Sequence, residues 1–163
     1  MTGQNVAFYA LAAAMSLSAI RVVTVKNVVH AALYLVVVLA GVAGLFILLA
    51  AEFLAGVQVL VYIGAIVVLF LFGIMLTRAP IGRSSDLDND QRGAGLVVSL
   101  FLLGILGSIL VDAFDDQKIE MDGIRSTGDI GLELFQSYVI PFEVISILLT
   151  AALVGAVVLA RRD

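Results

Sequence analysis

Four polar side chains stand in otherwise apolar stretches of the sequence, where each could hold or pass a proton. Gln58 and Tyr62 lie within residues 53–77, which carry no charge, while Glu143 lies in YVIPFEVISILL and His30 in KNVVHAALYL. Carboxyl and imidazole groups exchange protons, and amide and phenol groups bind water or partner groups. Polar residues at membrane depth are typical of ion pathways and of contacts between helices.

The stretch around Tyr62 has a helical polar stripe. Residues at i, i+4, i+7 and i+11 share one face of an α-helix, and here they are Gln58, Tyr62, Ala65 and Leu69. Buried glutamine and tyrosine need hydrogen-bond partners, so we expect this face to meet helices or water rather than lipid. Gly64 beside it destabilises a helix by about 0.5–1 kcal/mol relative to alanine and permits close packing, a bend or a π-bulge. Static packing and conformational change remain equal alternatives on these residues alone.

Glu143 and His30 each have two interpretations. Pro141 suits the first turn of a helix, which would place Glu143 near the third position, where free N–H groups and the helix dipole favour an anion. The alternative is a proton path or a polar contact with another subunit. His30, at the cytoplasmic start of a helix, could relay protons, or it could bond a carbonyl or a lipid headgroup.

Composition indicates a membrane protein without metal or redox ligands of its own. The chain is 62% hydrophobic and 13% charged, with a mean hydropathy of +1.15, whereas soluble domains are about 45–50% apolar and about 25% charged. The absence of cysteine excludes disulfides, thiolate catalysis and iron–sulfur ligation, and one histidine is too few for a multi-histidine site. No basic run suggests nucleic acid. We therefore predict no metal-binding residue and no cysteine-based catalytic residue in this chain.

The elements that hold these residues are predicted to be membrane helices. A span needs about 20 apolar residues, and five segments qualify. The sequence thus predicts an all-α integral membrane protein with a single domain over residues 1–163 and spans at residues 5–23, 29–51, 53–77, 93–111 and 139–160.

The basic residues predict an orientation. If the spans alternate, one side receives Arg21, Lys26, Arg78, Arg83, Arg92, Arg161 and Arg162, and the other receives Lys118 and Arg125. The positive-inside rule then places the N-terminus outside and the C-terminus in the cytoplasm.

An acidic outer loop is predicted over residues 112–137. Near its end Ile130, Leu134 and Phe135 have spacings that could lay a short helix on the membrane surface, but a solvated loop with one amphipathic turn is the favoured interpretation. No internal repeat is present, which argues against a stand-alone transporter.

Three stretches resemble one known family. EFLAGVQVLVYIGAIVVLFLFGIML is similar to the third membrane helix of the J-subunit family (NuoJ) of proton-translocating NADH:quinone oxidoreductase, respiratory complex I, whose mitochondrial members are NADH dehydrogenase subunit 6. NVVHAALYLV resembles that family's second helix, and YVIPFEVISILLTAALVGAVVLARR its final one. Val28 stands where the family often has proline and Val67 where methionine is frequent, so the departures affect packing.

The resemblance implies a role in coupling rather than in redox chemistry. Such subunits bind no cofactor; FMN, iron–sulfur clusters, NADH and quinone belong to other subunits of the complex. The resemblance implies a multi-pass protein of the inner (plasma) membrane, in contact with lipid and beside the A, H and K subunits. Its third helix would contain a π-bulge that rotates between states, with Tyr62 and Gly64 as the hinge, Val61 through Ile66 as the switching turn, and Gln58 supplying a polar group. Glu143 matches a family glutamate and is a secondary candidate.

Other functions remain open on the sequence. The chain could be the equivalent subunit of a membrane-bound hydrogenase or a multisubunit cation/proton antiporter, or it could be a purely structural helix scaffold in which Gly64 only packs.

Overall fold

The computed structural model describes residues 3–77, 91–115 and 126–161, and the secondary structure of these residues is helical throughout. The elements in chain order are α1 (Gly3–Thr24), α2 (Val28–Leu48), α3 (Glu52–Val57), the π-helix η1 (Gln58–Val67), α4 (Val68–Leu76), α5 (Arg92–Phe114), α6 (Thr127–Gln136) and α7 (Val139–Ala160). Because α3, η1 and α4 follow one another without a break, we call Glu52–Leu76 the third helix.

Five helices have the length and apolarity needed to cross a membrane: α1, α2, the third helix, α5 and α7. Their limits differ from the predicted spans by less than one helical turn, so the all-α class and the five spans are confirmed for the described residues. Arg78, Arg83, Lys118, Arg125 and Arg162, which entered the orientation argument, lie outside the described residues.

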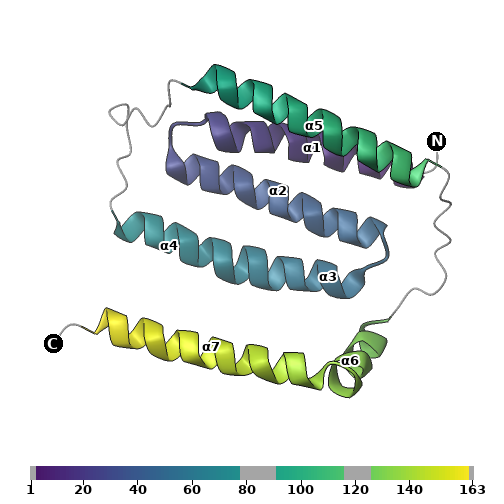
Figure 1. Ribbon diagram of the computed structural model, residues 1–163. Helices are drawn as coiled ribbons and strands as arrows, with labels where there is room; N and C mark the ends of the chain where they lie inside the picture. The colour runs from purple at the N-terminus through teal and green to yellow at the C-terminus, as the bar shows by residue number, and fades with distance from the viewer. Residues whose placement is uncertain (1–2, 78–90, 116–125, 162–163) are drawn as a thin grey trace.

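The five long helices alternate in direction (Figure 1). The end of α1, the short connection from α1 to α2 and the end of α7 therefore lie at the same end of the molecule, while the connection from α2 to the third helix lies at the opposite end. Arg21, Lys26 and Arg161 belong to the first group. The structure thus brings together basic residues that the orientation argument assigned to one side.

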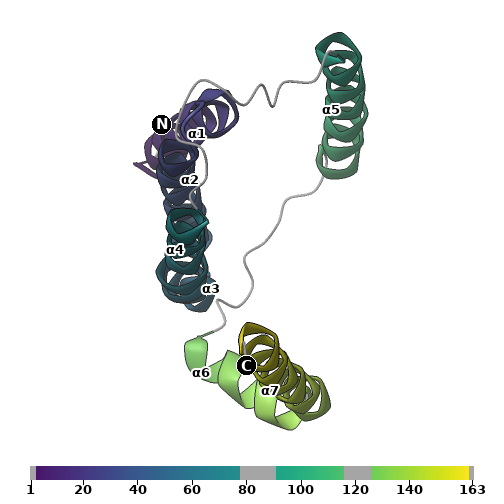
Figure 2. The same ribbon diagram turned by 90° about the vertical axis from the view of Figure 1, so that its left-hand side faces the viewer.

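Three helices pack into one layer, with α2 between α1 and the third helix (Figure 2). Most of the buried residues in this layer are small, among them Ala32, Ala43 and Ala55, which are at most 6% exposed. Small side chains let helix backbones approach closely, which is how helices gain packing energy where hydrophobic burial offers none.

Two glycines of α2 face α1. A Cβ atom on Gly41 would overlap the side chain of Met15, and one on Gly44 would lie 3.0 Å from Leu11 Cδ1. These two positions belong to the sequence AGVAG, residues 40–44, and leave no room for a larger residue. The α1–α2 contact therefore depends on glycine at these two sites.

The turn after α2 fixes how the third helix returns along the layer. The Ala51 amide donates to the Phe46 carbonyl at 2.8 Å and the Ala50 amide donates to the Ile47 carbonyl at 3.0 Å. Ala50 has φ 55°, the left-handed conformation that this type of helix end requires. The tight turn keeps α2 and the third helix side by side.

The remaining helices are separate from this layer. Every described side chain of α5 is exposed, and among the described elements α7 packs extensively only on α6. Figure 2 shows α5 and the α6–α7 pair on their own, connected to the layer by chain. This chain therefore supplies a three-helix layer and two further spans whose faces it does not cover.

The predicted outer loop contains a helix, so the favoured interpretation of a loop with one amphipathic turn is wrong. Ser126 caps α6: its hydroxyl accepts from the Asp129 amide at 3.2 Å, and Asp129 Oδ2 accepts from the Ser126 amide at 3.0 Å. This reciprocal capping box satisfies amides that the first turn leaves unpaired. The rings of Phe135 and Phe142 meet edge to face with centroids 5.1 Å apart, which joins α6 to α7.

Candidate functional site

The polar stretch of the third helix is a π-helix. η1 covers Gln58–Val67 and therefore includes Val61, Tyr62, Gly64 and Ile66. A π-helix bonds each amide to the carbonyl five residues earlier, has poorer geometry than an α-helix, and occurs mostly at functional sites. The π-bulge expected around the tyrosine and glycine is confirmed, whereas its rotation between states stays a prediction.

The π-helix changes which residues face the layer. The α-helical stripe predicted one shared face for Gln58 and Tyr62, but only Gln58 is buried, at 6% exposed, while Tyr62 is 47% exposed. The inward positions after Gln58 are instead Ile63, which is half-buried, and Val67, which is 3% exposed. Gln58 and Tyr62 therefore do not share one face in this conformation, because η1 bonds each amide to the carbonyl five residues earlier and Ile63, not Tyr62, follows Gln58 on the inward side. That Tyr62 meets a helix or water rather than lipid stays a prediction.

Gln58 connects two helices. Its Nε2 donates to the carbonyl oxygen of Leu39 on α2 at 3.4 Å, a long hydrogen bond in a part-buried position. A buried amide needs such a partner, because hydrocarbon offers none. Gln58 therefore anchors the first turn of η1 against the layer. This agrees with the expectation that a buried glutamine has a hydrogen-bond partner.

Gly64 has room around it. A Cβ atom there would meet only the carbonyl oxygen of Val59, at 3.4 Å, an ordinary van der Waals contact. Crowding within this chain therefore does not demand glycine at this position. What glycine adds is conformational freedom, because it holds a regular helix less firmly than any residue except proline.

Glu143 lies deeper in its helix than the sequence indicated. α7 begins at Val139, so Glu143 is its fifth residue and not its third. The free amides and most of the dipole effect belong to the first turn, and the Phe142 amide already bonds the Tyr138 carbonyl at 3.1 Å. The helix terminus therefore does not account for this carboxylate.

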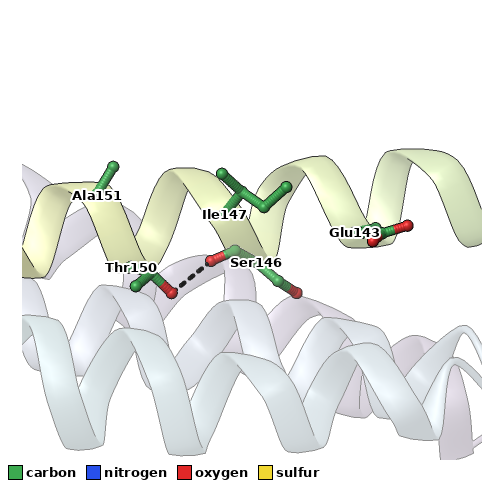
Figure 3. Close-up of a pocket in the computed structure, with 5 residues that line it drawn as sticks. All are labelled: Glu143, Ser146, Ile147, Thr150 and Ala151. Atoms are coloured by element: carbon green, nitrogen blue, oxygen red, sulfur yellow. Dashed lines mark hydrogen bonds between the residues drawn. The ribbon is translucent and has the colours of Figure 1, made fainter.

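Glu143 shares a face of α7 with two hydroxyl residues. Figure 3 shows Glu143, Ser146 and Thr150 along one side of the helix, with Ile147 and Ala151 beside them. These five residues line a groove of about 410 Å³. Glu143 forms no hydrogen bond or ion pair with any residue that the structure describes. The sequence singled out the carboxylate but missed the hydroxyls, which recur at i+3 and i+7 from it.

His30 is exposed in the first turn of α2, and the structure gives it no side-chain partner among the described residues. Its amide and that of Val29 donate to Asn27 Oδ1 at 3.4 and 2.9 Å. Asn27 is therefore the N-cap, a role that the sequence signals by an asparagine directly before an apolar run. Val28 takes the first helical position, where proline is frequent in helices generally.

The structure does not bring these candidates into one site. His30 is at the start of α2 and Glu143 near the start of α7, which are opposite ends of the molecule, while η1 lies between them (Figure 1). No group of three histidine, aspartate or glutamate residues in the described ranges could hold a metal ion. Within the described ranges, His30, Gln58, Tyr62 and Glu143 are therefore separate candidates and not one site.

Comparison with known proteins gives one consistent result. The family model for NADH-ubiquinone/plastoquinone oxidoreductase chain 6 matches residues 18–159. NAD(P)H-quinone oxidoreductase subunit 6 of the organellar chromatophore of Paulinella chromatophora is 42% identical over 98% of this chain and 79% of its own length. NAD(P)H-quinone oxidoreductase chain 6 of Leptolyngbya boryana is 41% identical over 98% and 81%. F(420)H(2) dehydrogenase subunit J of Methanosarcina mazei is 43% identical over 89% and 84%.

Proposed function

Because the chain belongs to the NADH-ubiquinone/plastoquinone oxidoreductase chain 6 family, we propose that it is a membrane-arm subunit of proton-translocating NADH:quinone oxidoreductase, respiratory complex I. The five apolar helices support a multi-pass subunit, and the names of the relatives support a complex that reduces quinone. In this proposal the chain couples quinone reduction to proton movement and does not itself transfer electrons.

The observation that carries the coupling role is the π-helix at Gln58–Val67. Its hydrogen bonds are one residue longer than those of an α-helix, so conversion to α moves the residues after it round the helix by one position, about 100°. The inward positions would then change from Ile63 and Val67 to Tyr62, Ala65 and Leu69. In the π register the third helix would thus turn an apolar face toward the layer, and in the α register a face with the Tyr62 hydroxyl.

This register change supplies a physical switch for protons. Tyr62 is 47% exposed in the π register, so its hydroxyl is available to water or to a neighbouring subunit. In the α register Tyr62 would turn toward α2, and its hydroxyl would lose contact with that water or neighbouring subunit. A hydrated path that used Tyr62 would be connected in one state and broken in the other, with Gly64 lowering the barrier because glycine constrains the backbone least.

The rest of the machinery lies elsewhere in this proposal. FMN, iron–sulfur clusters, NADH and quinone would be bound by other subunits, and the A, H and K subunits would be the neighbours of this chain. The chain would lie in the cell's inner (plasma) membrane with its N-terminus outside. The gathering of Arg21, Lys26 and Arg161 at one end supports this orientation, because basic residues are retained on the cytoplasmic side.

A second electron donor is a specific alternative. The relative from Methanosarcina mazei is named as a subunit of F(420)H(2) dehydrogenase and is as similar to this chain as the NAD(P)H relatives are. Similar chains thus serve complexes with different donors, which fits a coupling subunit distant from the donor site. NADH remains the proposed donor, since the matching family model carries that name.

Native gels of the solubilised membranes, stained for activity with each electron donor, distinguish these alternatives. The tagged chain is expected in a large band that reduces a dye with NADH and contains the A, H and K subunits by mass spectrometry. Reduction with F420H2 alone would change the donor and keep the coupling role. A band with hydrogenase or antiporter subunits would replace the proposed complex.

Gly64→Val tests the switch. A β-branched residue restricts the backbone and side chain of the turn, so we expect NADH-driven proton pumping in membrane vesicles to fall several-fold while the amount of assembled complex stays unchanged. Gly64→Ala is the matched control: the structure has space for its methyl group, and its effect should be smaller. Equal loss of pumping and assembly in Gly64→Val would instead support a structural scaffold.

A further inference from the structure

One face of α7 is polar although the helix is apolar elsewhere. Glu143, Ser146 and Thr150 follow one another at i, i+3 and i+7, a spacing that places them on one side of a helix. They line the groove of about 410 Å³ together with Ile147 and Ala151 (Figure 3). At 1.5 Å per residue the stripe is about 10 Å long. It runs from the outer part of the span toward its middle.

This stripe offers hydrogen-bond acceptors and no donors. Ser146 Oγ donates to the Phe142 carbonyl at 3.0 Å, and Thr150 Oγ1 donates to the Ser146 carbonyl at 2.9 Å. A hydroxyl has one hydrogen, so both are already used and only lone pairs face the groove. An ionised carboxylate is likewise an acceptor only. The matching chemistry is therefore a group rich in N–H donors.

The chain does not supply that group from its described residues. Glu143 has no partner there, and the basic residues Arg21, Lys26 and Arg161 lie at the other end of the molecule. An unpaired charge within a membrane span is unfavourable. Lipid chains would leave the carboxylate unpaired, so lipid is the wrong occupant for this face.

Short residues line the open groove beside Glu143. Ser146, Thr150 and Ala151 are short, and short residues let a second membrane helix approach closely. α7 packs extensively only on α6 among the described elements, and the side chains of its stripe are exposed. A long cationic side chain from such a helix can reach the carboxylate, and other donors of that helix can meet the hydroxyl oxygens.

We propose that the Glu143–Ser146–Thr150 face of α7 binds a transmembrane helix of a partner subunit that directs a lysine or arginine side chain at Glu143. The inference rests on the proposed function, because that function supplies partner subunits. It adds to it the place where a partner docks and the charge that the partner carries.

Photo-crosslinking in the intact complex tests the occupant. A genetically encoded benzophenone residue replaces Ile147, which lines the groove, or Ile145, which lies two positions earlier on the opposite face and serves as the matched control. After irradiation of native membranes, the tagged chain is purified under denaturing conditions and the attached peptide or lipid is identified by mass spectrometry.

We expect position 147 to crosslink to a membrane-spanning peptide of another subunit that contains lysine or arginine, and position 145 not to crosslink to that peptide. Crosslinks from position 147 only to lipid, to another helix of this chain, or to a partner peptide without a basic residue would overturn the proposal. Because Glu143 is unchanged in both variants, the result does not depend on a charge mutant that assembles.

Substitution of the carboxylate then tests the charge. Glu143→Gln is expected to lower the yield of the crosslink from position 147 several-fold, while Glu143→Asp keeps a larger part of it. Equal yields for glutamate and glutamine would contradict charge pairing. The native gel tests the proposed function separately. An NADH-oxidising band in which α7 crosslinks only to lipid would overturn the docking site alone. A partner crosslink in a band without quinone reductase activity would overturn the proposed function alone.

Discussion

At the residue scale, Gln58 is the side chain that links η1 to α2. Its hydrogen bond to the Leu39 carbonyl joins two membrane helices in a buried position. Such bonds contribute about 0.6 kcal/mol on average inside membrane proteins. We therefore expect Gln58→Leu to lower the thermal stability of the complex only slightly, because leucine loses one modest bond but suits its surroundings.

Gln58→Glu is the informative comparison for the same position. A carboxylate at a site that is 6% exposed has no cation nearby, so the destabilisation should exceed that of leucine and approach about 2.5 kcal/mol. Both variants are compared by the temperature at which the complex dissociates in mild detergent. A leucine variant less stable than the glutamate variant would contradict this account.

Tyr62 provides the second prediction at this scale. Tyr62→Phe keeps the ring and removes the hydroxyl, so assembly should be unchanged. If the hydroxyl holds water in the proton path, the loss of one hydrogen bond, about 0.5–1.5 kcal/mol, corresponds to a fall in pumping of roughly 2- to 10-fold. Proton uptake by vesicles per NADH oxidised measures it, and an unchanged ratio would leave Tyr62 a packing residue.

Hydrophobic periodicity found the residues of η1 but not their arrangement, whereas the family resemblance led us to expect a π-bulge there. Gln58, Tyr62 and Gly64 stand out because amide, phenol and glycine are unusual in an apolar span. The face they share was derived from α-helical spacing, and the π-helix shifts that face by one residue. Periodicity cannot reveal a π-helix in advance, because the same apolar residues fit either register.

At the element scale, the contact between α1 and α2 depends on glycine. Gly41→Leu would force its side chain into Met15, and overpacking of this kind destabilises by about 1–3 kcal/mol. We expect less assembled complex on native gels at equal expression. Gly56→Leu is the control, since a Cβ atom at Gly56 meets nothing within 4 Å; equal losses in both variants would place the effect outside the α1–α2 contact.

The cap of α6 gives a separate prediction. Ser126→Ala removes the acceptor for the Asp129 amide, and loss of such a cap destabilises a helix by about 1 kcal/mol. Amide hydrogen exchange in the first turn of α6 should then be roughly fivefold faster. Ser137→Ala, at the other end of the helix, is the control and should leave that turn unchanged. Exchange unaffected by Ser126→Ala would mean that the contact between Phe135 and Phe142 holds α6 in place by itself.

At the scale of the whole molecule, orientation in the membrane can be tested directly, because the chain contains no cysteine. Lys26→Cys marks the α1–α2 connection and Gly128→Cys marks the first turn of α6. We expect a membrane-impermeant maleimide added to intact cells to label position 128 and not position 26. The opposite labelling would reverse the orientation and place the basic residues outside.

Hydropathy predicted the five spans well because bilayer thickness sets the length of each helix. It could not predict that α5 and α7 stand apart from the layer of α1, α2 and the third helix. α5 is apolar nearly all round, and α7 is apolar apart from the Glu143–Ser146–Thr150 face, so hydropathy alone does not tell which side of either helix packs on the layer. Glu143 was found for its charge, but its depth in α7 depends on a helix start that Pro141 placed two residues too late.

The exposed α5 and α7 also have a consequence for the life of the protein in the cell. Membrane insertion of this chain does not by itself bury these helices, so a copy made without its partners would present an unpaired carboxylate and two bare helices to the bilayer. Cellular chaperones and proteases continuously remove protein that does not reach its folded state. The amount of this chain in the cell should therefore follow the amount of its partners. Deleting a neighbouring subunit should shorten the half-life of this chain rather than leave a stable free pool of it.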